Sequence, residues 1–258
     1  MVGAVYFAVV FLACLLGAVA GLGGGVFIRP VFDALGYHGM ADIQFFSSSA
    51  ILAMAVVSTI KKVRDGSEID KVKVALVSAG ALLGGALGDL LLQRVAALSP
   101  TEAAAQTVQT AATVAMLLAS LVLTAKSSHR FVLKRKGMGF VFGIGLGAVA
   151  VFLGVGGGPV NVPLLMIFFG LSMKTAAAYS IVIIFFSHLS RLVTTFATVG
   201  FYGLDLAMLL YIVPAAVLGG FAGARFSKAL PDKTVKKMFV GAVSSVILLN
   251  IANGIFIF

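Results

Sequence analysis

The chain contains the same glycine-rich motif twice. GLGGG at residues 21–25 is followed by Pro30, and GVGGG at residues 154–158 is followed by Pro163, so a shift of 133 residues relates both pairs. Each motif interrupts apolar segments, and a broken helix at membrane depth frees N–H and C=O groups that lipid cannot satisfy. Such backbone is stable only inside protein or beside a polar cavity. Two breaks at equivalent positions are typical of the substrate site of a secondary transporter.

The composition excludes an ordinary soluble domain. Hydrophobic residues make up 60% of the 258 residues, charged residues make up 11%, and the mean hydropathy is +1.12. The net charge of +10 is carried by short basic clusters between apolar segments, so we expect it to orient the chain in a membrane and not to bind nucleic acid. Cys14 is the only cysteine, which excludes an intrachain disulfide and a cysteine metal cluster.

The sequence lacks the signatures of an enzyme. The glycine motifs do not have the spacing of a dinucleotide or phosphate loop, and the three histidines do not have metal-ligand spacing. We therefore expect no catalytic residue, no metal and no cofactor.

Ten apolar segments follow one another along the chain. The two that come directly after the glycine motifs are too short to cross a bilayer as helices, since a span needs about 20 residues. We expect these two, 26–36 and 159–171, to be half-helices. The other segments are 3–20, 43–60, 72–93, 103–125, 138–153, 175–198, 204–227 and 236–257.

The repeat extends beyond the glycine motifs. The shift of 133 carries Ser47 onto Ser180, and GGALG at 84–88 resembles GGFAG at 219–223 at a shift of 135. Small residues of this kind suit close helix packing. The sequence predicts an all-α membrane protein with two structural repeats, 1–125 and 138–258, joined by a basic cytoplasmic connection at 126–137.

Basic residues indicate that the repeats are inverted. They fill the connection after 43–60, the connection between the halves and the connection after 204–227, whereas residues 199–203 contain no Lys or Arg. Equivalent loops of inverted repeats face opposite sides, so only one of each pair attracts positive charge. The basic residues are Lys61, Lys62, Arg64, Lys71, Lys73, Lys126, Arg130, Lys134, Arg135, Lys136, Arg225, Lys228, Lys233, Lys236 and Lys237.

Two topologies are compatible with these segments. If each glycine-centred segment forms a re-entrant helical hairpin followed by three transmembrane helices, six full spans remain, both termini lie outside and every basic connection is cytoplasmic. Eight simple spans with both termini inside would place the 225–237 connection on the opposite side, and this arrangement remains an alternative because the charge rule is statistical.

The duplicated motif resembles the TauE/SafE family of sulfite and organosulfonate transporters. Gly-x-Gly-Gly-Gly followed by proline, with a serine-bearing helix after it, is similar in both halves, and the resemblance covers nearly the whole chain. It implies a multi-pass transporter that moves sulfite, sulfoacetate or other sulfonates across the prokaryotic cytoplasmic membrane. The first motif carries VFIR before its proline where the second carries PVNV, so the two half-sites need not contribute equally.

The glycine motifs have the chemistry of an anion site. A half-helix that begins at a glycine cluster has unpaired N–H groups and the positive end of its dipole at that point. The alternative is that the glycines only allow tight turns and helix crossings. The expected oxyanion contacts are Gly23, Gly24, Gly25, Gly156, Gly157 and Gly158.

Ionisable residues within apolar segments indicate function by default. A guanidinium at Arg29 or Arg191 can bind an oxyanion through paired N–H groups. The alternatives are a snorkelling side chain for Arg29 and an ion pair with a carboxylate such as Asp205 for Arg191. His188, one turn before Arg191, is a candidate proton carrier or a hydrogen-bonded structural histidine. Asp89, near Arg94, is interpreted as a gating or packing ion pair with no transport role.

Neutral side chains complete the expected site. Ser47, Ser48, Asn161 and Ser180 can donate to an anion, with the equivalence of Ser47 and Ser180 as the strongest argument, although membrane-buried hydroxyls often bond their own helix. The expected partners are therefore a small anion, the lipid bilayer and a coupling ion, proton or sodium. A passive anion channel and a non-transporting membrane scaffold are the alternative functions.

Overall fold

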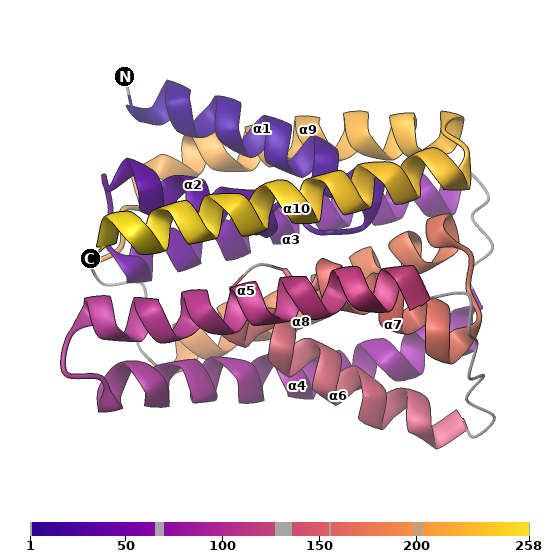
Figure 1. Ribbon diagram of the computed structural model, residues 1–258, viewed down its shortest axis with the longest axis horizontal. Coiled ribbons are helices and arrows are strands. Elements are labelled where there is room, and N and C mark those ends of the chain that lie inside the picture. The colour runs from indigo at the N-terminus through magenta and orange to yellow at the C-terminus, as the bar shows by residue number, and fades with distance from the viewer. Residues whose placement is uncertain are drawn as a thin grey trace.

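The computed structural model describes residues 2–64, 70–126, 136–154, 156–198, 200 and 203–257. These residues are helical with short connections and contain no strand (Figure 1). The elements of the first half are α1 (Val2–Ala20), α2 (Gly25–Leu35), α3 (Met40–Arg64), α4 (Lys71–Leu98) and α5 (Glu102–Lys126), and those of the second half are α6 (Lys136–Leu153), α7 (Gly158–Phe169), α8 (Met173–Thr198), the 3-10 turn η1 (Leu206–Met208), α9 (Leu209–Ala229) and α10 (Asp232–Ile257).

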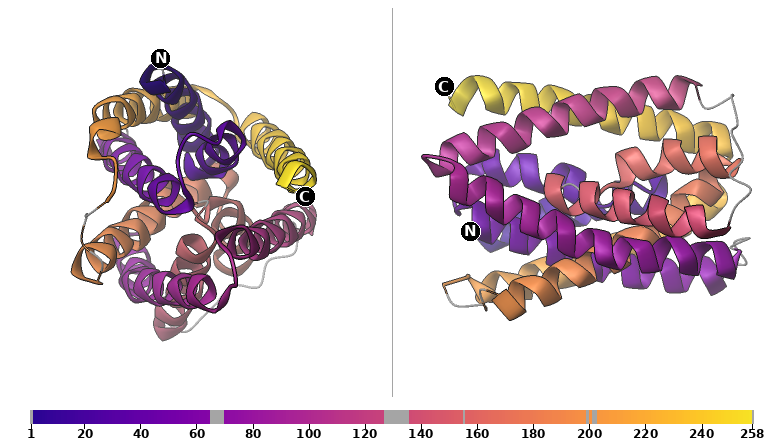
Figure 2. Two further views of the ribbon diagram at one scale, coloured as in Figure 1. Left: turned by 90° about the vertical axis from the view of Figure 1, so that its left-hand side faces the viewer. Right: turned by 90° about the horizontal axis from the view of Figure 1, so that it is seen from below.

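Seven helices of the described residues are long and apolar enough to cross a membrane: α1, α3, α4, α5, α8, α9 together with η1, and α10. Helices α3 and α8 are the most enclosed, with 67% of their span residues buried. Figure 2 shows the bundle end on and from below, with the long helices running in roughly the same direction. Large apolar side chains such as Leu210 and Leu248 lie exposed on the outer surface, as expected for a surface that faces lipid.

The two predicted half-helices are confirmed. Helix α2 has 11 residues and α7 has 12, and each begins at the end of a glycine motif and contains the predicted proline. Each also ends at a glycine in the left-handed conformation, Gly36 and Gly170, both with φ of 65°. A residue without a Cβ adopts this conformation without strain, so the sequence defines both ends of each short helix.

Each short helix folds back on the helix before it. The ring of Tyr6, near the start of α1, stacks on that of Phe32, near the end of α2, with centroids 3.8 Å apart. In the second half, Phe142 near the start of α6 lies 5.4 Å from Phe168 near the end of α7. Both pairs of helices are therefore antiparallel hairpins with the glycine motif at the tip.

The tips of the two hairpins touch. A Cβ atom on Gly158 would overlap the backbone of Leu22, and one on Gly23 would lie 3.6 Å from the Cα atom of Gly156. No side chain fits between the tips at Gly158, so glycine is required there by close approach of backbone.

The small-residue patches pack as the sequence predicts. A Cβ atom on Gly84 or Gly88 of α4 would overlap a backbone carbonyl of α6, and one on Gly219 or Gly223 of α9 would overlap a backbone carbonyl of α1. In both pairs the residue numbers of the contacting positions rise in the same direction along the two helices. Helix α4 therefore runs parallel to α6, and α1 runs parallel to α9. Backbones that approach this closely gain dispersion contacts without a hydrophobic driving force, which is the usual mode of helix association in lipid.

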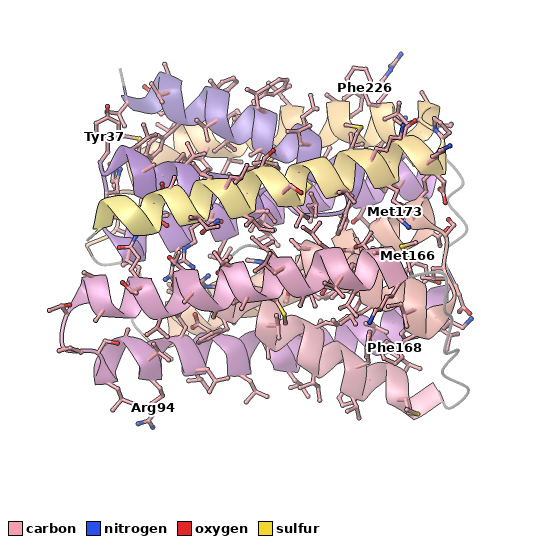
Figure 3. All side chains as sticks on the ribbon, viewed as in Figure 1. Tyr37, Arg94, Met166, Phe168, Met173 and Phe226 are labelled. Atoms are coloured by element: carbon pink, nitrogen blue, oxygen red, sulfur yellow. The ribbon has the colours of Figure 1, made fainter. Side chains whose placement is uncertain are left out.

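The basic residues gather at one end of the bundle. The C-terminal ends of α3, α5 and α9 and the N-terminal ends of α4, α6, α8 and α10 lie there (Figure 1). Figure 3 shows Phe168 and Phe226 at this end, and Tyr37 and Arg94 at the other. We call these the basic end and the opposite end. The described basic residues at the basic end are Lys61, Lys62, Arg64, Lys73, Lys126, Lys174, Arg225, Lys228, Lys233, Lys236 and Lys237.

Candidate functional site

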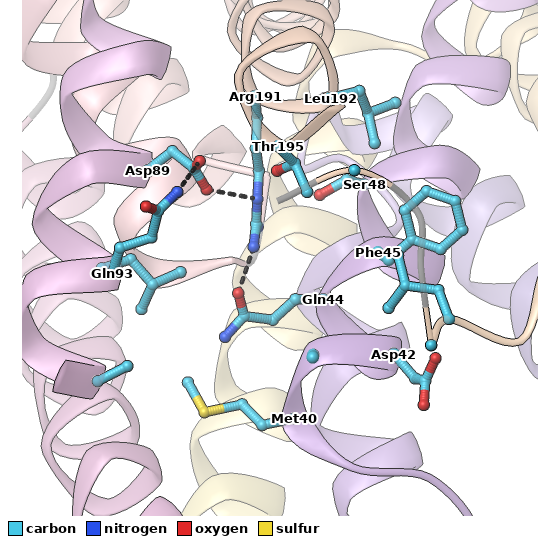
Figure 4. A pocket seen from close by; sticks show the side chains of 16 residues that line it. Met40, Asp42, Gln44, Phe45, Ser48, Asp89, Gln93, Arg191, Leu192 and Thr195 are labelled. Carbon is cyan, nitrogen blue, oxygen red and sulfur yellow. Dashed lines mark hydrogen bonds and ion pairs between the residues drawn. The ribbon is translucent and has the colours of Figure 1, made fainter. Parts of the chain in front are cut away.

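A cavity of about 470 Å³ lies toward the opposite end, between the start of α3 and the ends of α4 and α8. Its walls are mostly apolar, with a group of polar side chains from all three helices (Figure 4). A few placed polar groups in an apolar enclosure are typical of small-ligand sites. The polar side chains that line it are Asp42, Gln44, Ser48, Asp89, Gln93, Arg191 and Thr195.

Arg191 is the cation of this cavity. Its side chain is buried, with a residue exposure of 5%, and its Nε lies 3.3 Å from Oδ1 of Asp89. Its Nη2 donates to Oε1 of Gln44, while Nη1 has no hydrogen-bond partner among the described residues. The guanidinium is thus oriented by a carboxylate through Nε, and the two N–H bonds of Nη1 have no acceptor among the described residues.

The carboxylate partner of Arg191 is Asp89 and not Asp205, the partner considered from the sequence. Arg191 pairs with Asp89, whereas the carboxylate of Asp205 lies 3.5 Å from Nε2 of His38. The other carboxylate oxygen of Asp89 accepts from Nε2 of Gln93 at 2.9 Å. Arg94, the neighbour considered for Asp89, is exposed and points away from the bundle (Figure 3).

Arg29 lies in a second buried cluster. Its exposure is 3%, and its Nε is 3.6 Å from Oδ2 of Asp33, one turn along α2. Its Nη1 donates to the carbonyl oxygen of Leu153 at 2.6 Å and its Nη2 donates to Oε1 of Gln109 at 2.5 Å. Because Leu153 is the last residue of α6, the positive charge stands at the negative end of that helix.

Two glutamines join the arginine clusters. Nε2 of Gln44 lies 3.4 Å from Oε1 of Gln109, which also accepts from Arg29. Gln44 in turn accepts from Arg191. The buried polar residues of α2, α5, α3 and α8 therefore form one connected chain between the hairpin and the cavity.

The equivalent serines make equivalent bonds across the halves. Ser180 donates to the carbonyl oxygen of Gly21 at 2.7 Å, and Ser47 lies 3.4 Å from the carbonyl oxygen of Gly154. Each therefore satisfies a carbonyl that the other half frees at its glycine motif. The neighbouring Ser48 lines the cavity, and its hydroxyl has no hydrogen-bond partner among the described residues.

Comparison with known proteins identifies the family. The profile described as "Sulfite exporter TauE/SafE" matches residues 6–249. The chain belongs to the TauE/SafE family. The match includes both hairpins, the serine pair and every residue of the arginine clusters.

Two relatives carry the description "Probable membrane transporter protein MamO". The protein from Magnetospirillum gryphiswaldense is 26% identical over 265 residues, covering 89% of this TauE/SafE chain and 42% of that protein. The one from Paramagnetospirillum magneticum is 28% identical over 113 residues, covering 42% of the chain and 18% of that protein. The chain thus spans less than half the length of the curated relatives that it matches. No solved structure matches it.

The chain is therefore a member of a membrane transporter family, with seven candidate membrane spans among its described residues. Of the residues selected from sequence, Arg191 and Ser48 line the cavity. The other selected residues are buried elsewhere in the bundle: Gly23, Gly24, Gly25, Arg29, Ser47, Gly156, Gly157, Gly158, Asn161, Ser180 and His188.

His188 and Asn161 are among the buried side chains whose polar atoms have no partner in the part of the chain that the structure describes. Neither ring nitrogen of His188 and neither amide atom of Asn161 has a hydrogen bond there, although both residues have an exposure of 0%. Buried polar groups without partners are costly, and they are found most often where a protein binds or moves something.

Asp89 was predicted to have no transport role, and the sequence did not lead us to select Gln93, Gln109 or Asp33. Asp89 lies within the apolar segment 72–93, where an ionisable residue indicates function by default. That signal was sufficient to select it. Gln109 and Gln93 carry no such signal, since a single amide in a long helix also occurs on exposed faces.

Proposed function

We propose that this protein is a secondary transporter that moves small sulfur-containing anions, such as sulfite, sulfoacetate or other organosulfonates, across the prokaryotic cytoplasmic membrane by alternating access. The observation that carries the proposal is the guanidinium of Arg191, which is buried in a cavity at one end of the bundle and keeps Nη1 without a partner among the described residues. A trigonal oxyanion group accepts paired N–H bonds from such a side chain.

The packing of the halves supports inverted repeats. The pairs α1 with α9 and α6 with α4 are equivalent, and both are parallel. Gln44 near the start of α3 meets Arg191 near the end of α8, so these two equivalent helices are antiparallel. This supports the division into a first repeat at 1–125, a connection at 126–137 and a second repeat at 138–258.

We infer that each hairpin is re-entrant. In this arrangement α3, α4, α5, α8, α9 and α10 are the six full spans, and α1–α2 and α6–α7 enter from opposite sides. Helix α1 is long enough to cross alone, but its antiparallel partner α2 returns the chain to the same end. The basic end then faces the cytoplasm, in agreement with the positive-inside rule.

Substrate capture requires one exchange of bonds. The anion accepts from Nη1 of Arg191 and displaces the neutral amide of Gln44 from Nη2, while Asp89 keeps the guanidinium oriented through Nε. Ser48 donates a further hydrogen bond from the same wall. Release of Gln44 loosens its contact with Gln109 and thereby connects occupation of the cavity with the hairpin residue Arg29.

A carrier is favoured over a passive channel because the cavity lies toward one end and the hairpin tips pack against each other at Gly158 and Leu22. We assign the glycine tips to the barrier that alternates, with their N–H groups facing the anion as it passes. His188, one turn from Arg191, is the proposed proton carrier if transport is coupled to protons.

Flux into proteoliposomes tests the proposal. Sulfite, thiosulfate, sulfoacetate, taurine, sulfate and simple carboxylates are compared with and without an imposed pH or sodium gradient. We expect gradient-dependent accumulation of at least one sulfur anion. At a low substrate concentration, the rate of uptake should fall at least about tenfold in Arg191→Ala. The matched control is Arg94→Ala, which removes the same charge from an exposed position at the same end. Transport of carboxylates alone would refute the substrate class, and ohmic conductance without accumulation would refute the carrier.

A further inference from the structure

We propose a second oxyanion site at the basic end, formed around Lys62 with Lys174 and Ser227, which holds the anion when the transporter opens on that side. The inference rests on the proposed function and names the cytoplasm-facing site of the same pathway. None of the residues that line the Arg191 cavity belongs to this second site, because the cavity is lined by the start of α3 and the ends of α4 and α8.

Lys62 is a buried ammonium without a carboxylate partner. It lies at the end of α3 with an exposure of 7%, and its Nζ is 3.3 Å from the hydroxyl oxygen of Ser227. No described carboxylate forms an ion pair with it. The Ser227 hydroxyl itself lies 3.3 Å from the carbonyl oxygen of Val19. A buried charge is costly unless it is paired, so this ammonium favours an anionic ligand.

The surroundings add positive charge. Nζ of Lys174 donates to the carbonyl oxygen of Lys228 at 3.2 Å, which places a second ammonium group beside the residue that follows Ser227. The carboxylate of Asp232 accepts from the backbone N–H groups of Met173 and Lys174 at 3.0 and 3.2 Å, where it caps α8. Its oxygens therefore face the helix end.

The repeat places this cluster opposite the Arg191 cavity. The shift of 133 relates Thr195 to Lys62 and Ala41 to Lys174, since 195 − 62 and 174 − 41 both equal 133. The shift of 135 relates Leu92 to Ser227 and Gln93 to Lys228, since 227 − 92 and 228 − 93 both equal 135. The Arg191 cavity is lined by all four of the residues that these shifts relate to the cluster, namely Ala41, Leu92, Gln93 and Thr195. The cluster is thus the repeat-related counterpart of that cavity at the other end of the bundle.

The two sites differ in their cation. The position equivalent to Arg191 is Ser58, whose hydroxyl lies 3.1 Å from the carbonyl oxygen of Gly220. A lysine is a point charge without the paired N–H geometry of a guanidinium. We therefore expect the basic-end site to bind more weakly and to discriminate less between oxyanions than the Arg191 site.

Sided transport kinetics test the assignment. The half-saturating concentration of sulfoacetate and of sulfite is measured from each face of oriented proteoliposomes made of phosphatidylcholine alone. We expect Lys62→Gln to raise the half-saturating concentration about tenfold when the anion is added at the basic face, and less than about twofold when it is added at the opposite face. The half-saturating concentration of Lys62→Arg should be near that of wild type. Lys126→Gln, which removes an exposed charge at the same end, is the control. An equal change from both faces, or none, would overturn the site. A change that appears only after anionic lipid is added would assign the pocket to a lipid phosphate and also overturn it.

A labelling measurement separates this inference from failure of the proposed transport. Ser227→Cys in a Cys14→Ala background places a single thiol beside Lys62. We expect a membrane-impermeant maleimide to label it from the basic face only, and sulfoacetate or sulfate to slow the labelling severalfold unless Lys62→Gln is also present. This holds whether or not flux is observed. Labelling that neither anion slows, or that both slow equally without Lys62, contradicts the proposal.

Discussion

The hydroxyl of Ser180 donates a hydrogen bond to the carbonyl oxygen of Gly21 at 2.7 Å, across 159 residues of chain. Ser47 stands in the same relation to Gly154 at 3.4 Å. Each half of the protein therefore completes the backbone bonding of the other half at its glycine motif. A helix break buried inside the bundle needs such partners for its free backbone groups, so we expect the two breaks to stabilise each other.

We expect Ser180→Ala to destabilise the protein by about 1–3 kcal/mol, because it leaves a buried carbonyl without a donor. Ser47→Ala should cost less, since its bond is longer. Thermal unfolding of the purified variants in one detergent measures both. The control is Ser245→Ala, whose exposed hydroxyl bonds its own helix at Gly241. Equal stability of Ser180→Ala and wild type would contradict a structural role for this bond.

Gln44→Glu should weaken anion binding by at least about tenfold. The new carboxylate has nearly the same shape, accepts from Nη2 of Arg191 and repels an incoming anion. Gln44→Ala, which removes the competing amide without adding charge, should bind the anion at least as tightly as wild type. Binding isotherms for the transported anion compare the two variants, and the reverse order of affinities would refute displacement of Gln44.

Gly223→Leu should destabilise the bundle by about 1–3 kcal/mol or prevent its folding, because even a Cβ atom there would overlap the carbonyl oxygen of Leu15. Gly241→Leu is the matched control, since nothing lies within 4 Å of a Cβ atom at Gly241 of α10. Expression in membranes and thermal unfolding report the difference. Comparable stability of the two variants would show that α1 and α9 do not pack at the distance observed.

Asp70 gives the protein a pH-dependent contribution to stability. Hydrogen bonds from the backbone N–H of Lys73 and its ammonium, together with the N–H of Val72, hold the pKa of this N-cap carboxyl below its ordinary value. A depressed pKa in the folded state adds stability above the unfolded pKa, and this stability is lost as the pH falls through the folded pKa. Wild type should therefore exceed Asp70→Asn in melting temperature at neutral pH, and the difference should shrink as the pH falls below the ordinary pKa of an aspartate. A difference that persists or grows on acidification would contradict the assignment.

The amino-acid sequence by itself determined the local structure. The glycine motifs with Pro30 and Pro163 defined two short helices, and the patches at 84–88 and 219–223 identified surfaces for close packing. These features depend on residues near one another in the chain, where backbone freedom, missing side chains and the length of an apolar segment decide the outcome. Buried arginines were also recognisable, since a charge within an apolar segment is costly wherever the segment lies.

Only the tertiary structure decided which side chains meet. Arg191 pairs with Asp89 and not with Asp205 because α4 and α8 pack so closely that a Cβ atom on Gly85 would overlap the carbonyl oxygen of Ser187. The chain from Arg29 through Gln109 and Gln44 to Arg191 joins four helices, and no spacing along the sequence encodes it. The reason is physical: a hydrogen bond or ion pair forms over about 3–4 Å. The sequence specifies the faces of each helix, but the packing of those faces sets the distances.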